Sequence, residues 1–413
     1  MKAVVVALGK VGLPLAAQIA RAGHEVVGCD VDERVVELVN AATPPFPNEE
    51  GLEEALRDAV GAGRLRAVTD TSAAVAEGPD LVVAVPPLFV DEQARPDWRI
   101  LDSVVADIAR GLRSGTTVSI ETTVPVGTTR ERIAPALERA SGLRAEDDFH
   151  VVFSPERVYS GRVLRDLATY PKLVGGLSEE GEARGVALYE QFIEGADVWG
   201  MGSAEAAEMA KLAETTYRDL NIAFANELAR AADARGLDVQ RVIDAANSQP
   251  FSHIHRPGVA VGGHCIPVYP RFYLAGDPDA RLPKVAREVN ERMPAYAVDL
   301  LGEVEGRTVL VLGVAYRGGV KETAFSGAHA LRDELRRRRA RAVFADPLFT
   351  AGELREEGFE PWDGGPADLA IVQADHFEYR TLHDVGGASV VVDGRGVVEE
   401  APPGVEVRRI GRP

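Results

Sequence analysis

The chain opens with a strand, a glycine-bearing turn, a helix and a second strand that ends on an acidic residue. KAVVVAL is a continuous, largely β-branched apolar run, which is typical of a buried parallel strand. GKVG follows as the turn, LPLAAQIARAG as a helix ended by Gly23, and EVVGCDVD as a strand that reaches Asp30. This βαβ unit predicts a parallel sheet with helices packed on its faces.

The turn and Asp30 together indicate a dinucleotide site. In such a unit the amides at the helix start bind a pyrophosphate, and the carboxylate accepts hydrogen bonds from ribose hydroxyls. The run departs from G-x-G-x-x-G because Ala7 stands at the first glycine position. A strand–turn–helix without a ligand is the plainer alternative. Asp30 favours NAD, whereas Arg34 would suit the 2′-phosphate of NADP.

The alternation of strands and helices continues with DLVVAVPP (80–87), TTVSIETTVPVG (116–127) and HVVFSPERV (150–158), which we read as strands. Strand ends in such a sheet line the ligand crevice, although turn chemistry alone explains any one of the residues there. The predicted crevice residues are Thr123, Pro125, Pro155 and Glu156. The predicted cofactor contacts are Gly9, Lys10, Val11, Gly12, Asp30, Arg34, Pro86 and Thr123.

A long helix is predicted over 203–237, because this stretch has no proline and its first glycine is Gly236. A helix of this length in an enzyme usually joins domains or forms an interface. Lys211 and Thr215 are four residues apart and share one face. From the pattern alone, the simpler reading of Lys211 is a solvated ion pair with Glu208 or Glu214.

The last third of the chain repeats the pattern of the first. TVLVLGVAY, SGAHALRDELRRRRA and RAVFADP read as strand, helix and a strand ending on Asp346, and strands over 368–376 and 388–396 follow. We therefore expect a second α/β domain, without a clean G-x-G-x-x-G. Its loop YRGGVKETAFSG could bind phosphate through glycine amides, Arg317 and Lys321.

Composition narrows the class of protein. The chain has 413 residues and a net charge of −18, which argues against nucleic acid as a main partner. Its two cysteines lie far apart, so a reducing cytoplasm fits better than a disulfide framework. No stretch reaches the roughly 18 apolar residues of a membrane span. The apolar run at the start is broken at Gly9 and Lys10, too early for a signal peptide.

One cysteine, Cys265, lies in the loop GVAVGGHCIPVYP, between paired glycines and two prolines. A structural cysteine prefers an apolar core, whereas a nucleophile needs backbone amides and an approach path. The neighbouring His264 does not make a zinc site with it, because two adjacent ligands without a C-x-x-C provide no tetrahedral set. We expect no metal, and we expect His264 to shape the loop by a hydrogen bond.

Taken together, these segments resemble the UDP-glucose/GDP-mannose dehydrogenases, the nucleotide-sugar 6-dehydrogenases. The resemblance covers nearly the whole chain in the right order, and its most specific part is the cysteine loop after a lysine-bearing helix. It is carried by LGKVGLPLA, ETTVPVGTT, SPERVYSG with PKLVGG, AEMAKLAETTYRDLNIAFANELA and VGGHCIPVYP.

The resemblance implies an α/β fold of two Rossmann-like, doubly wound domains joined by a long central helix and a helical segment. The expected domains are an NAD-binding domain over 1–198, a helical dimerisation domain over 199–297 that carries the lysine and the cysteine loop, and a UDP-sugar-binding domain over 298–413. It also implies NAD as cofactor, a UDP-sugar substrate and a homodimer.

The family oxidises the sugar CH2OH to a carboxylate with two NAD+. The resemblance implies that Cys265 forms a thiohemiacetal and then a thioester, and that Lys211 stabilises the oxyanions. Glu156 would activate the hydrolytic water and Thr123 would hold it. The implied substrate-binding residues are Arg157, Lys211, Thr215, Asn221, Arg256, Gly262, Tyr269, Arg317 and Lys321.

The chain departs from the family pattern at three places. Thr215 stands where the family commonly has Asn, and Tyr269 stands where it has Asp. The run ETAFS replaces Asp-x-Arg-Glu-Ser, so that Ala324 and Phe325 take the places of Arg and Glu. A tyrosine, with an ordinary pKa of about 10, is no carboxylate at pH 7. Either a distinct substrate subgroup or a reduced activity explains these changes, and we favour the substrate subgroup.

The short chain and GHCIPV are nearest the N-acetylhexosamine branch, so UDP-N-acetylmannosamine or UDP-N-acetylglucosamine ranks first, before UDP-glucose and GDP-mannose. Two other classes stay open. A two-electron β-hydroxyacid dehydrogenase would share the NAD domain and a lysine-bearing helix but has no need of Cys265. A non-catalytic nucleotide-sugar-binding paralogue would tolerate Tyr269 and Thr215.

Overall fold

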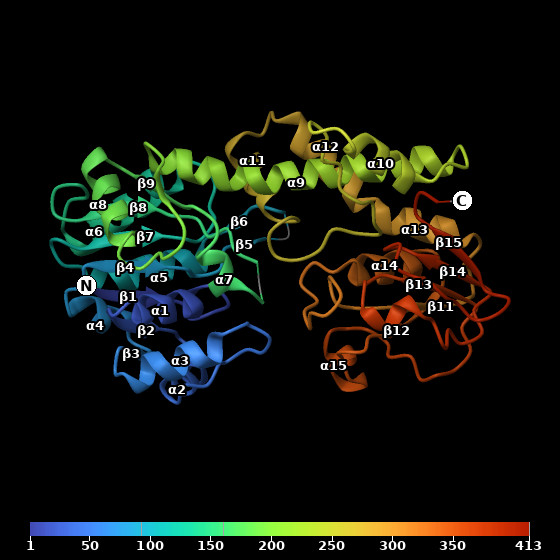
Figure 1. Cartoon of the computed structure of the whole chain (residues 1–413), viewed down its shortest axis with the longest axis horizontal. Coiled ribbons are helices and arrows are strands. Elements are labelled where there is room, and N and C mark those ends of the chain that lie inside the picture. Colours follow the sequence, from blue (N-terminus) through green and yellow to red (C-terminus); the bar gives the residue numbers. More distant parts are fainter. Residues whose placement is uncertain (92, 160, 413) are drawn as a thin grey trace. The chain divides into compact units, whose positions relative to one another are not determined.

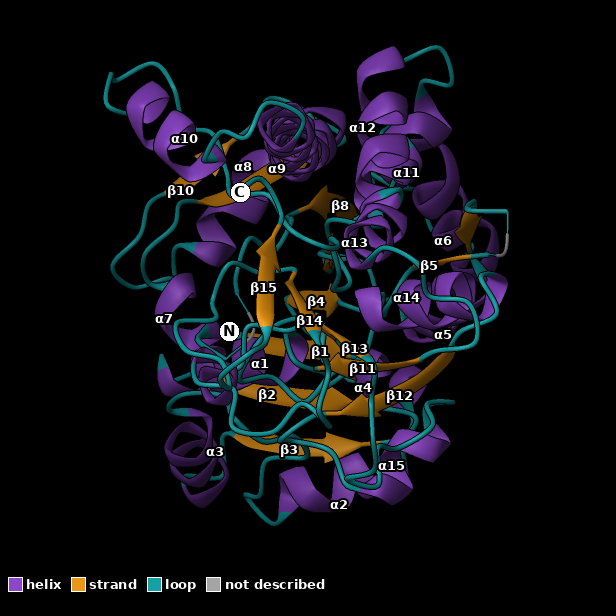
Figure 2. Cartoon of the chain, turned by 90° about the vertical axis from the view of Figure 1, so that its right-hand side faces the viewer, coloured by secondary structure: helices purple, strands orange, loops and turns teal. Residues whose placement is uncertain are grey.

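A computed structural model describes residues 1–91, 93–159 and 161–412, and Figure 1 shows the course of the chain. The chain divides into two compact units, Met1–Glu214 and Thr215–Pro413. Each unit has its own sheet, with helices beside it (Figure 2). This confirms the predicted α/β class with two Rossmann-like folds.

The first unit is built on a sheet whose strand order is β10-β9-β8-β7-β4-β1-β2-β3 within the described residues. Neighbouring strands are parallel except β8 and β9, which are antiparallel. The strands are β1 (Lys2–Val6), β2 (Glu25–Cys29), β3 (Leu65–Val68), β4 (Leu81–Ala84), β7 (Thr117–Ile120), β8 (His150–Phe153), β9 (Lys172–Gly176) and β10 (Val198–Gly200), and β5 (Phe89–Val90) pairs separately with β6 (Pro96–Asp97).

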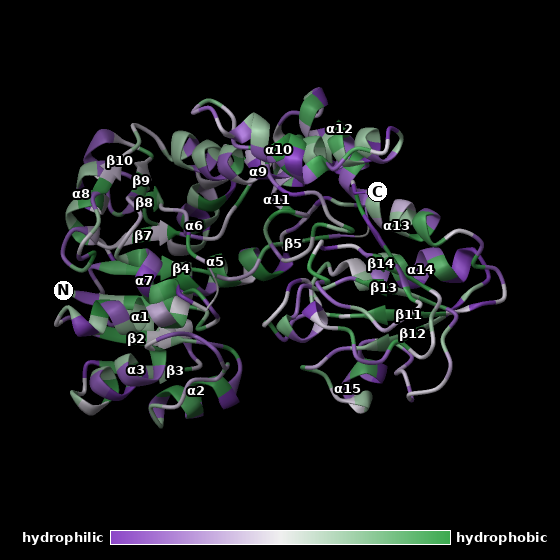
Figure 3. Ribbon diagram, turned by 45° about the vertical axis from the view of Figure 1, so that its right-hand side comes forward, coloured by the Kyte–Doolittle hydropathy of each residue, from purple (hydrophilic) through white to green (hydrophobic). Residues whose placement is uncertain are grey.

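Helices flank this sheet and bury its β-branched side chains. The helix α1 packs against α3 and α7, whereas α5 packs against α4 and α6. The strands carry mostly apolar residues (Figure 3), because both of their faces are covered. The helices are α1 (Gly12–Arg21), α2 (Glu33–Asn40), α3 (Leu52–Gly61), α4 (Thr71–Ala76), α5 (Arg99–Gly111), the π-helix η1 (Thr129–Ile133), α6 (Ala134–Ser141), α7 (Val163–Leu167) and α8 (Glu179–Tyr189).

Several predicted strands are shorter than expected: the one predicted over 80–87 covers Leu81–Ala84, and the one predicted over 150–158 ends at Phe153. The strand predicted over 116–127 ends at Ile120, and residues 121–128 form a loop. Thr122 in this loop donates its hydroxyl to the carbonyl of Pro86 at 2.5 Å. The carbonyl of Pro125 likewise accepts the Thr128 hydroxyl and N–H. Side-chain hydroxyls thus take the place of strand pairing, which the apolar pattern does not reveal.

The predicted long helix is α9 (Ala204–Asp233). It ends before Gly236, which has a left-handed φ of 65° that suits glycine after a helix. The next helix then starts at Asp238, whose carboxylate accepts the N–H of Gln240 at 2.8 Å. Among the helices of the described ranges, none is long and apolar enough to cross a membrane.

The second unit holds an all-parallel sheet of order β12-β11-β13-β14-β15 in the part of the chain described. Its apolar core packs on both faces, one of them against α13 and α14. Its elements are α10 (Val239–Asn247), α11 (Tyr269–Gly276), α12 (Arg281–Glu291), α13 (Met293–Leu301), β11 (Thr308–Leu312), α14 (Gly327–Arg337), β12 (Arg341–Ala345), α15 (Ala351–Glu356), β13 (Leu369–Val372), the 3-10 helix η2 (Phe377–Arg380), β14 (Val390–Asp393) and β15 (Glu406–Arg409).

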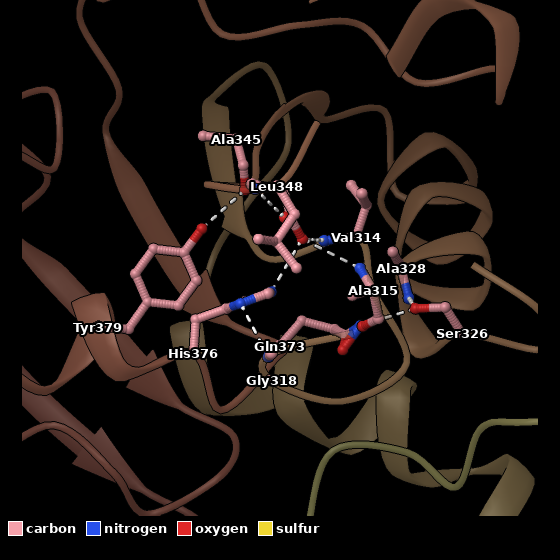
Figure 4. A network of polar contacts seen from close by, with 12 residues as sticks. Val314, Ala315, Gly318, Ser326, Ala328, Ala345, Leu348, Gln373, His376 and Tyr379 are labelled. Carbon is pink, nitrogen blue, oxygen red and sulfur yellow. Dashed lines mark hydrogen bonds and ion pairs between the residues drawn. The ribbon is translucent and has the colours of Figure 1, made fainter. Parts of the chain in front are cut away.

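Asp346, directly after β12, closes the turn after β11 through hydrogen bonds to Val314 and Ala315, which Figure 4 shows near His376. Its carboxylate accepts the N–H groups of Val314 at 2.8 Å and Ala315 at 3.1 Å, and it contacts His376 Nε2 at 3.1 Å. Burial alone would raise the pKa of Asp346, but the hydrogen bonds from His376 and the backbone outweigh burial and lower it. The second unit therefore repeats the pattern of the first, in which an aspartate after the second strand supports the turn after the first strand. Asp346 is buried, and its carboxylate accepts hydrogen bonds from that turn.

Candidate active site

The first βα turn is shaped by three small residues. Ala7 has a φ of 75°, a left-handed conformation that the glycine expected there would adopt without strain. A Cβ on Gly12 would lie 2.0 Å from the carbonyl oxygen of Ala7, so this position requires glycine. A Cβ on Gly9 would meet nothing within 4 Å. The turn is therefore closely packed where Gly12 meets Ala7, and it faces solvent at Gly9 and Lys10.

Asp30 lies directly after β2 and supports this turn. One of its carboxylate oxygens accepts the N–H of Leu8 at 2.8 Å, and the other accepts the N–H of Asp32 at 3.0 Å. Each oxygen has a second lone pair for a ribose hydroxyl. Arg34 is exposed in the first turn of α2, beyond Asp30. The open Gly9 cradle, the start of α1 and Asp30 suit the pyrophosphate and ribose of a dinucleotide.

The ends of β4 and β7 form the next part of the crevice. Pro86 follows β4, and the hydrogen bond from Thr122 to its carbonyl joins the two loops. Thr123 is 6% exposed, one residue farther along. The loop places Thr123 at the carboxyl end of the sheet, where the sequence analysis expects the ligand crevice.

A buried group of charges surrounds Glu156. Lys172, the first residue of β9, contacts the Glu156 carboxylate and lies 3.0 Å from that of Glu121. Lys172 is 4% and Glu121 is 2% exposed. Tyr189 donates its hydroxyl proton to Glu121, and its hydroxyl oxygen accepts a hydrogen bond from the Ser119 hydroxyl at 2.8 Å. The sequence analysis selected Glu156 but missed Lys172 and Glu121, although both stand in its motifs, PKLVGG and ETTVPVGTT.

Arg157 fastens the segment that carries Glu156. Its guanidinium donates to the carbonyl of Pro171 at 2.5 Å, directly before Lys172, and lies 3.9 Å from Glu214. The residue predicted to bind substrate therefore also ties the loop after β8 to the start of β9.

Lys211 and Thr215 are both buried on α9, at 6% and 5% exposure. The reading of Lys211 as a solvated side chain is therefore wrong. Glu208, one of its expected partners, accepts the N–H groups of Gly127 at 2.5 Å and Thr129 at 2.9 Å, and the Thr129 hydroxyl at 2.6 Å. Glu208 thus anchors the loop that contains Thr123 onto the helix that contains Lys211.

Burial raises the pKa of Glu208 from 4.5 to about 7, although its hydrogen bonds oppose the shift. The native state then binds a proton more tightly than the unfolded chain. The stabilisation is complete below pH 4.5 and is lost as the pH rises through 7, by about 3 kcal/mol at most. We expect the melting temperature to fall over this window in the wild type. Circular dichroism should show a flatter profile for Glu208→Gln.

A control lies on the same helix. The hydrogen bond from Arg130 lowers the pKa of Glu205, so Glu205 stabilises the fold only above its unfolded pKa. Glu205→Gln should leave the fall between pH 4.5 and 7 in place. If Glu208→Gln keeps that fall as well, another group causes it.

Cys265 lies in the second unit, exposed at the end of a glycine-built loop. A Cβ on Gly262 would lie 2.7 Å from the Cβ of Tyr316, so the loop approaches Tyr316 as only glycine permits. The carbonyl of Cys265 accepts the N–H of Val268 at 3.2 Å and of Tyr269 at 2.8 Å, which begins α11. The thiol is thus held on a rigid turn and open to solvent.

Two backbone contacts dock this loop on the second unit. Gly263 donates its N–H to the carbonyl of Ala324 at 2.9 Å, and Val259 donates to Gly394 at 2.9 Å. Arg395 reinforces them, because its guanidinium donates to the carbonyls of Ala260 at 3.1 Å and Tyr316 at 3.2 Å. The sequence analysis missed Arg395, and no local motif marks it.

Two of the three departures from the family pattern fall in or beside this docking region, whereas the third, Thr215, lies on α9. Ala324 contributes its carbonyl, and Phe325 has a left-handed φ of 49° and is 43% exposed. His264 contacts the carboxylate of Glu322, which is the kind of loop contact we expected. Tyr269 starts α11, with its ring centre 5.7 Å from that of Phe272. A backbone contact at Ala324 and an aromatic contact at Tyr269 thus occur at positions where the family pattern has charged side chains.

Three of the remaining residues predicted to bind substrate contact other protein groups, and the fourth, Arg256, is exposed to solvent. Asn221 donates to the carbonyl of His253 at 2.7 Å and accepts the N–H of His255 at 2.9 Å, so it holds the strand-like segment that leads to the exposed Arg256. Arg317 donates to the Tyr316 hydroxyl at 3.0 Å, and Lys321 pairs with Glu353.

The two thiols differ in a way that chemical labelling can test. Cys29 is fully buried at the end of β2, and burial raises its pKa to about 12, whereas Cys265 is exposed. The thiolate is the reactive form. We expect iodoacetamide at neutral pH to label Cys265 in the native protein and both cysteines in urea, as measured by peptide mass spectrometry. Labelling of native Cys29 at a comparable rate would contradict this structure.

The NAD-binding-domain model of the UDP-glucose/GDP-mannose dehydrogenase family matches residues 1–193, and the central-domain model of the same family matches residues 205–292. A UDP-N-acetyl-D-mannosamine dehydrogenase of Pyrococcus horikoshii is 34% identical over 100% of this chain and 99% of its own. An NDP-N-acetyl-D-galactosaminuronic acid dehydrogenase of Ralstonia solanacearum is 33% identical over 95% of each chain.

Solved structures agree with these relatives. The structure of the UDP-D-ManNAc dehydrogenase from Pyrococcus horikoshii has a TM-score of 0.90 at 31% identity, covering 100% of this chain and 99% of that one. The NDP-N-acetyl-D-galactosaminuronic acid dehydrogenase from Methanosarcina mazei Go1 has a TM-score of 0.86 at 28% identity, covering 100% and 95%. The similarity therefore extends over both units.

Proposed function

Because this chain belongs to the UDP-glucose/GDP-mannose dehydrogenase family, we propose that it oxidises the C6 hydroxymethyl group of a UDP-N-acetylhexosamine to a carboxylate. UDP-N-acetylmannosamine is the first candidate, because relatives over the full length carry that name. UDP-N-acetylglucosamine, UDP-glucose and GDP-mannose follow. The observation that carries the proposal is the exposed Cys265 on its rigid glycine loop.

The NAD-dependent chemistry is that of the family, and the first βα turn fits the cofactor. Gly9 leaves room beside the turn, the amides at the start of α1 would bind the pyrophosphate, and Asp30 would accept the ribose hydroxyls. Lys10, Val11, Arg34, Pro86 and Thr123 complete the proposed set. NAD+, when bound, accepts one hydride in each of two oxidation steps.

Cys265 is the proposed nucleophile. Its thiolate attacks the C6 aldehyde left by the first oxidation, a C–S bond forms, and the oxygen takes up a proton to give a thiohemiacetal. The second oxidation removes the C6 hydrogen as hydride and the hydroxyl proton, which leaves a thioester. Water then attacks, the C–S bond breaks and the thiolate returns. The sum is CH2OH + 2 NAD+ + H2O → COO− + 2 NADH + 3 H+.

Three residues of the first unit would assist this sequence. The ammonium of Lys211 is buried, where a positive charge stabilises an alkoxide or tetrahedral oxyanion more strongly than in water. The Glu156 carboxylate would accept the proton of the hydrolytic water, and the Thr123 hydroxyl would hold that water. The proposed substrate contacts are Arg157, Lys211, Thr215, Asn221, Arg256, Gly262, Tyr269, Arg317 and Lys321.

Tyr269 and Thr215 bear on proton transfer. A tyrosine does not replace a carboxylate base near neutral pH, so Glu156 and Lys211 would have to handle the protons released around Cys265. Thr215 keeps a hydroxyl donor on the face of α9 that carries Lys211. We interpret these changes as marks of a substrate subgroup.

The assembly is also part of the proposal. We propose a cytoplasmic homodimer formed through the central helical segment, with functional domains over 1–198, 199–297 and 298–413. In support, α9 carries three large apolar side chains that are 43–55% exposed in the single chain. They are Met209, Tyr217 and Phe224.

The test is the stoichiometry of cofactor reduction. The full-length protein would be incubated with NAD+ and a panel of UDP- and GDP-sugars, with NADH measured at 340 nm and products by mass spectrometry. We expect two NADH and one carboxylate per sugar, with the fastest turnover on a UDP-N-acetylhexosamine. One NADH per sugar would point to a two-electron dehydrogenase. Tight nucleotide-sugar binding without NADH would point to a non-catalytic paralogue.

A further inference from the structure

Lys172 lies between two buried carboxylates in the first unit. The order β9-β8-β7 places Lys172, at the start of β9, next to the loops that follow β8 and β7. Its Nζ contacts Glu156 and is 3.0 Å from Glu121 Oε1. The side chains of all three residues are at most 8% exposed. Water therefore screens these charges little, and each one strongly affects the other two.

Glu121 has a second hydrogen-bond partner besides Lys172. The Tyr189 hydroxyl donates to Glu121, and Lys172 Nζ lies 5.1 Å from the centre of the Tyr189 ring. Burial lowers the pKa of Lys172, attraction to Glu121 raises it, and repulsion from Lys211 lowers it further. Two carboxylates and two ammonium groups thus balance within one buried cluster. Removing any one of them leaves an uncompensated charge.

We propose that Lys172 and Glu121 are positioning residues for Glu156: Lys172 holds the Glu156 carboxylate ionised in place, and Glu121 shares the lysine charge so that Glu156 remains able to accept a proton from water. The proposal rests on the role of Glu156 in the proposed function. A lone Lys172–Glu156 pair would stabilise the charged carboxylate and weaken it as a base, whereas removal of the lysine would favour the protonated carboxyl group.

Substitutions of Lys172 and of Glu121 should therefore shift the pKa of Glu156 in opposite directions. Lys172→Met removes a positive charge beside two buried carboxylates, so the pKa of Glu156 should rise. Glu121→Gln leaves Lys172 to Glu156 alone, so that pKa should fall. We expect displacements of at least about one pH unit in each direction. Lys172→Arg keeps the charge and should stay near the wild type.

The first measurement needs neither substrate nor cofactor. Carboxyl infrared bands of the full-length protein would be followed from pH 4 to 9, and the Glu156 band would be identified by its loss in Glu156→Gln. Opposite displacements of this band in Lys172→Met and Glu121→Gln are the expected result. An unchanged Glu156 titration in both variants would overturn the proposal, whatever reaction the protein catalyses.

The second measurement uses turnover on the sugar accepted by the wild type. In Lys172→Met, hydrolysis of the thioester should become slow. The variant should then form two NADH per Cys265 in a rapid burst, and a covalent adduct should accumulate in its intact mass spectra. We expect kcat to fall by about 100-fold or more in Lys172→Met near neutral pH, with KM little changed. The acid limb of the pH profile of kcat should move to higher pH in Lys172→Met and to lower pH in Glu121→Gln. Loss of kcat without movement of that limb would mean a merely structural role.

Controls separate this inference from the proposed function. Lys2→Met removes a lysine of the same unit that pairs with Glu77 at 2.7 Å at the amino end of β1, away from the crevice, and should leave the profile unchanged. If the wild type oxidises no sugar, the proposed function fails, while the infrared titration still decides the role of Lys172. If Lys172→Met does not fold, Glu121→Gln still tests the proposal, because the pKa of Glu156 should fall in Glu121→Gln and stay near the wild-type value in Lys172→Arg.

Discussion

Cys265→Ala should lower carboxylate formation by at least about 1,000-fold, while the protein stays folded. Without the thiol, the C6 aldehyde cannot become a thioester, so the second oxidation loses its covalent substrate. The side chain is exposed and its loop is held by backbone contacts at Gly263 and Val259, so its removal should leave the melting temperature almost unchanged. The readout is carboxylate per sugar by mass spectrometry, beside NADH per sugar.

The matched control is Cys29→Ala. Cys29 is the other free cysteine, fully buried at the end of β2, so its removal should cost about 1 kcal/mol of stability and leave two NADH per sugar. Cys265→Ser tests the sulfur itself, because an alcohol ionises far less readily than a thiol and is the weaker nucleophile near neutral pH. Carboxylate formation by Cys265→Ala at the wild-type rate would eliminate the covalent route.

The sequence predicted those parts of the fold that are buried on both faces. The runs that become β1, β4, β11 and β13 are continuously apolar, and such a run has few alternatives in a chain that alternates with helices. The strand β15 was missed because its residues, Glu406–Arg409, are charged and only partly buried. The predicted strand over 116–127 was too long because hydroxyl-to-carbonyl bonds, invisible in the pattern, turn its second half into a loop.

Only those site residues that stand within single sequence motifs could be predicted from the sequence. Cys265, Glu156 and Lys211 stand in segments that the family resemblance marks, but their surroundings depend on which strands become neighbours. Lys172 meets Glu121 because β9 joins the sheet antiparallel beside β8, an arrangement that no local pattern reveals. The same holds for Lys211, whose burial by tertiary packing overrides the helix pattern that favoured a solvated ion pair.

Gly12→Ala should destabilise the first unit by about 3 kcal/mol or more, because the new Cβ would lie 2.0 Å from the carbonyl oxygen of Ala7. Neither atom is the flexible end of a side chain, so β1 and α1 would have to separate. Ala7 already occupies a left-handed φ and cannot relax further at low cost. For a domain of this size, the melting temperature should fall by about 6–12 °C, measured by calorimetry.

Gly9→Ala is the matched control on the same turn, because its Cβ would enter open space. Its melting temperature should stay within a degree or two of the wild type, yet NAD+ binding by isothermal titration should weaken by at least about tenfold, since the methyl group occupies room that the pyrophosphate needs. The pair separates two reasons for glycine in one turn: Gly12 permits strand and helix to approach each other, and Gly9 would permit the proposed cofactor to approach the turn. Equal loss of stability in the two variants would mean that the turn serves packing alone, and unchanged NAD+ affinity in Gly9→Ala would place the dinucleotide elsewhere.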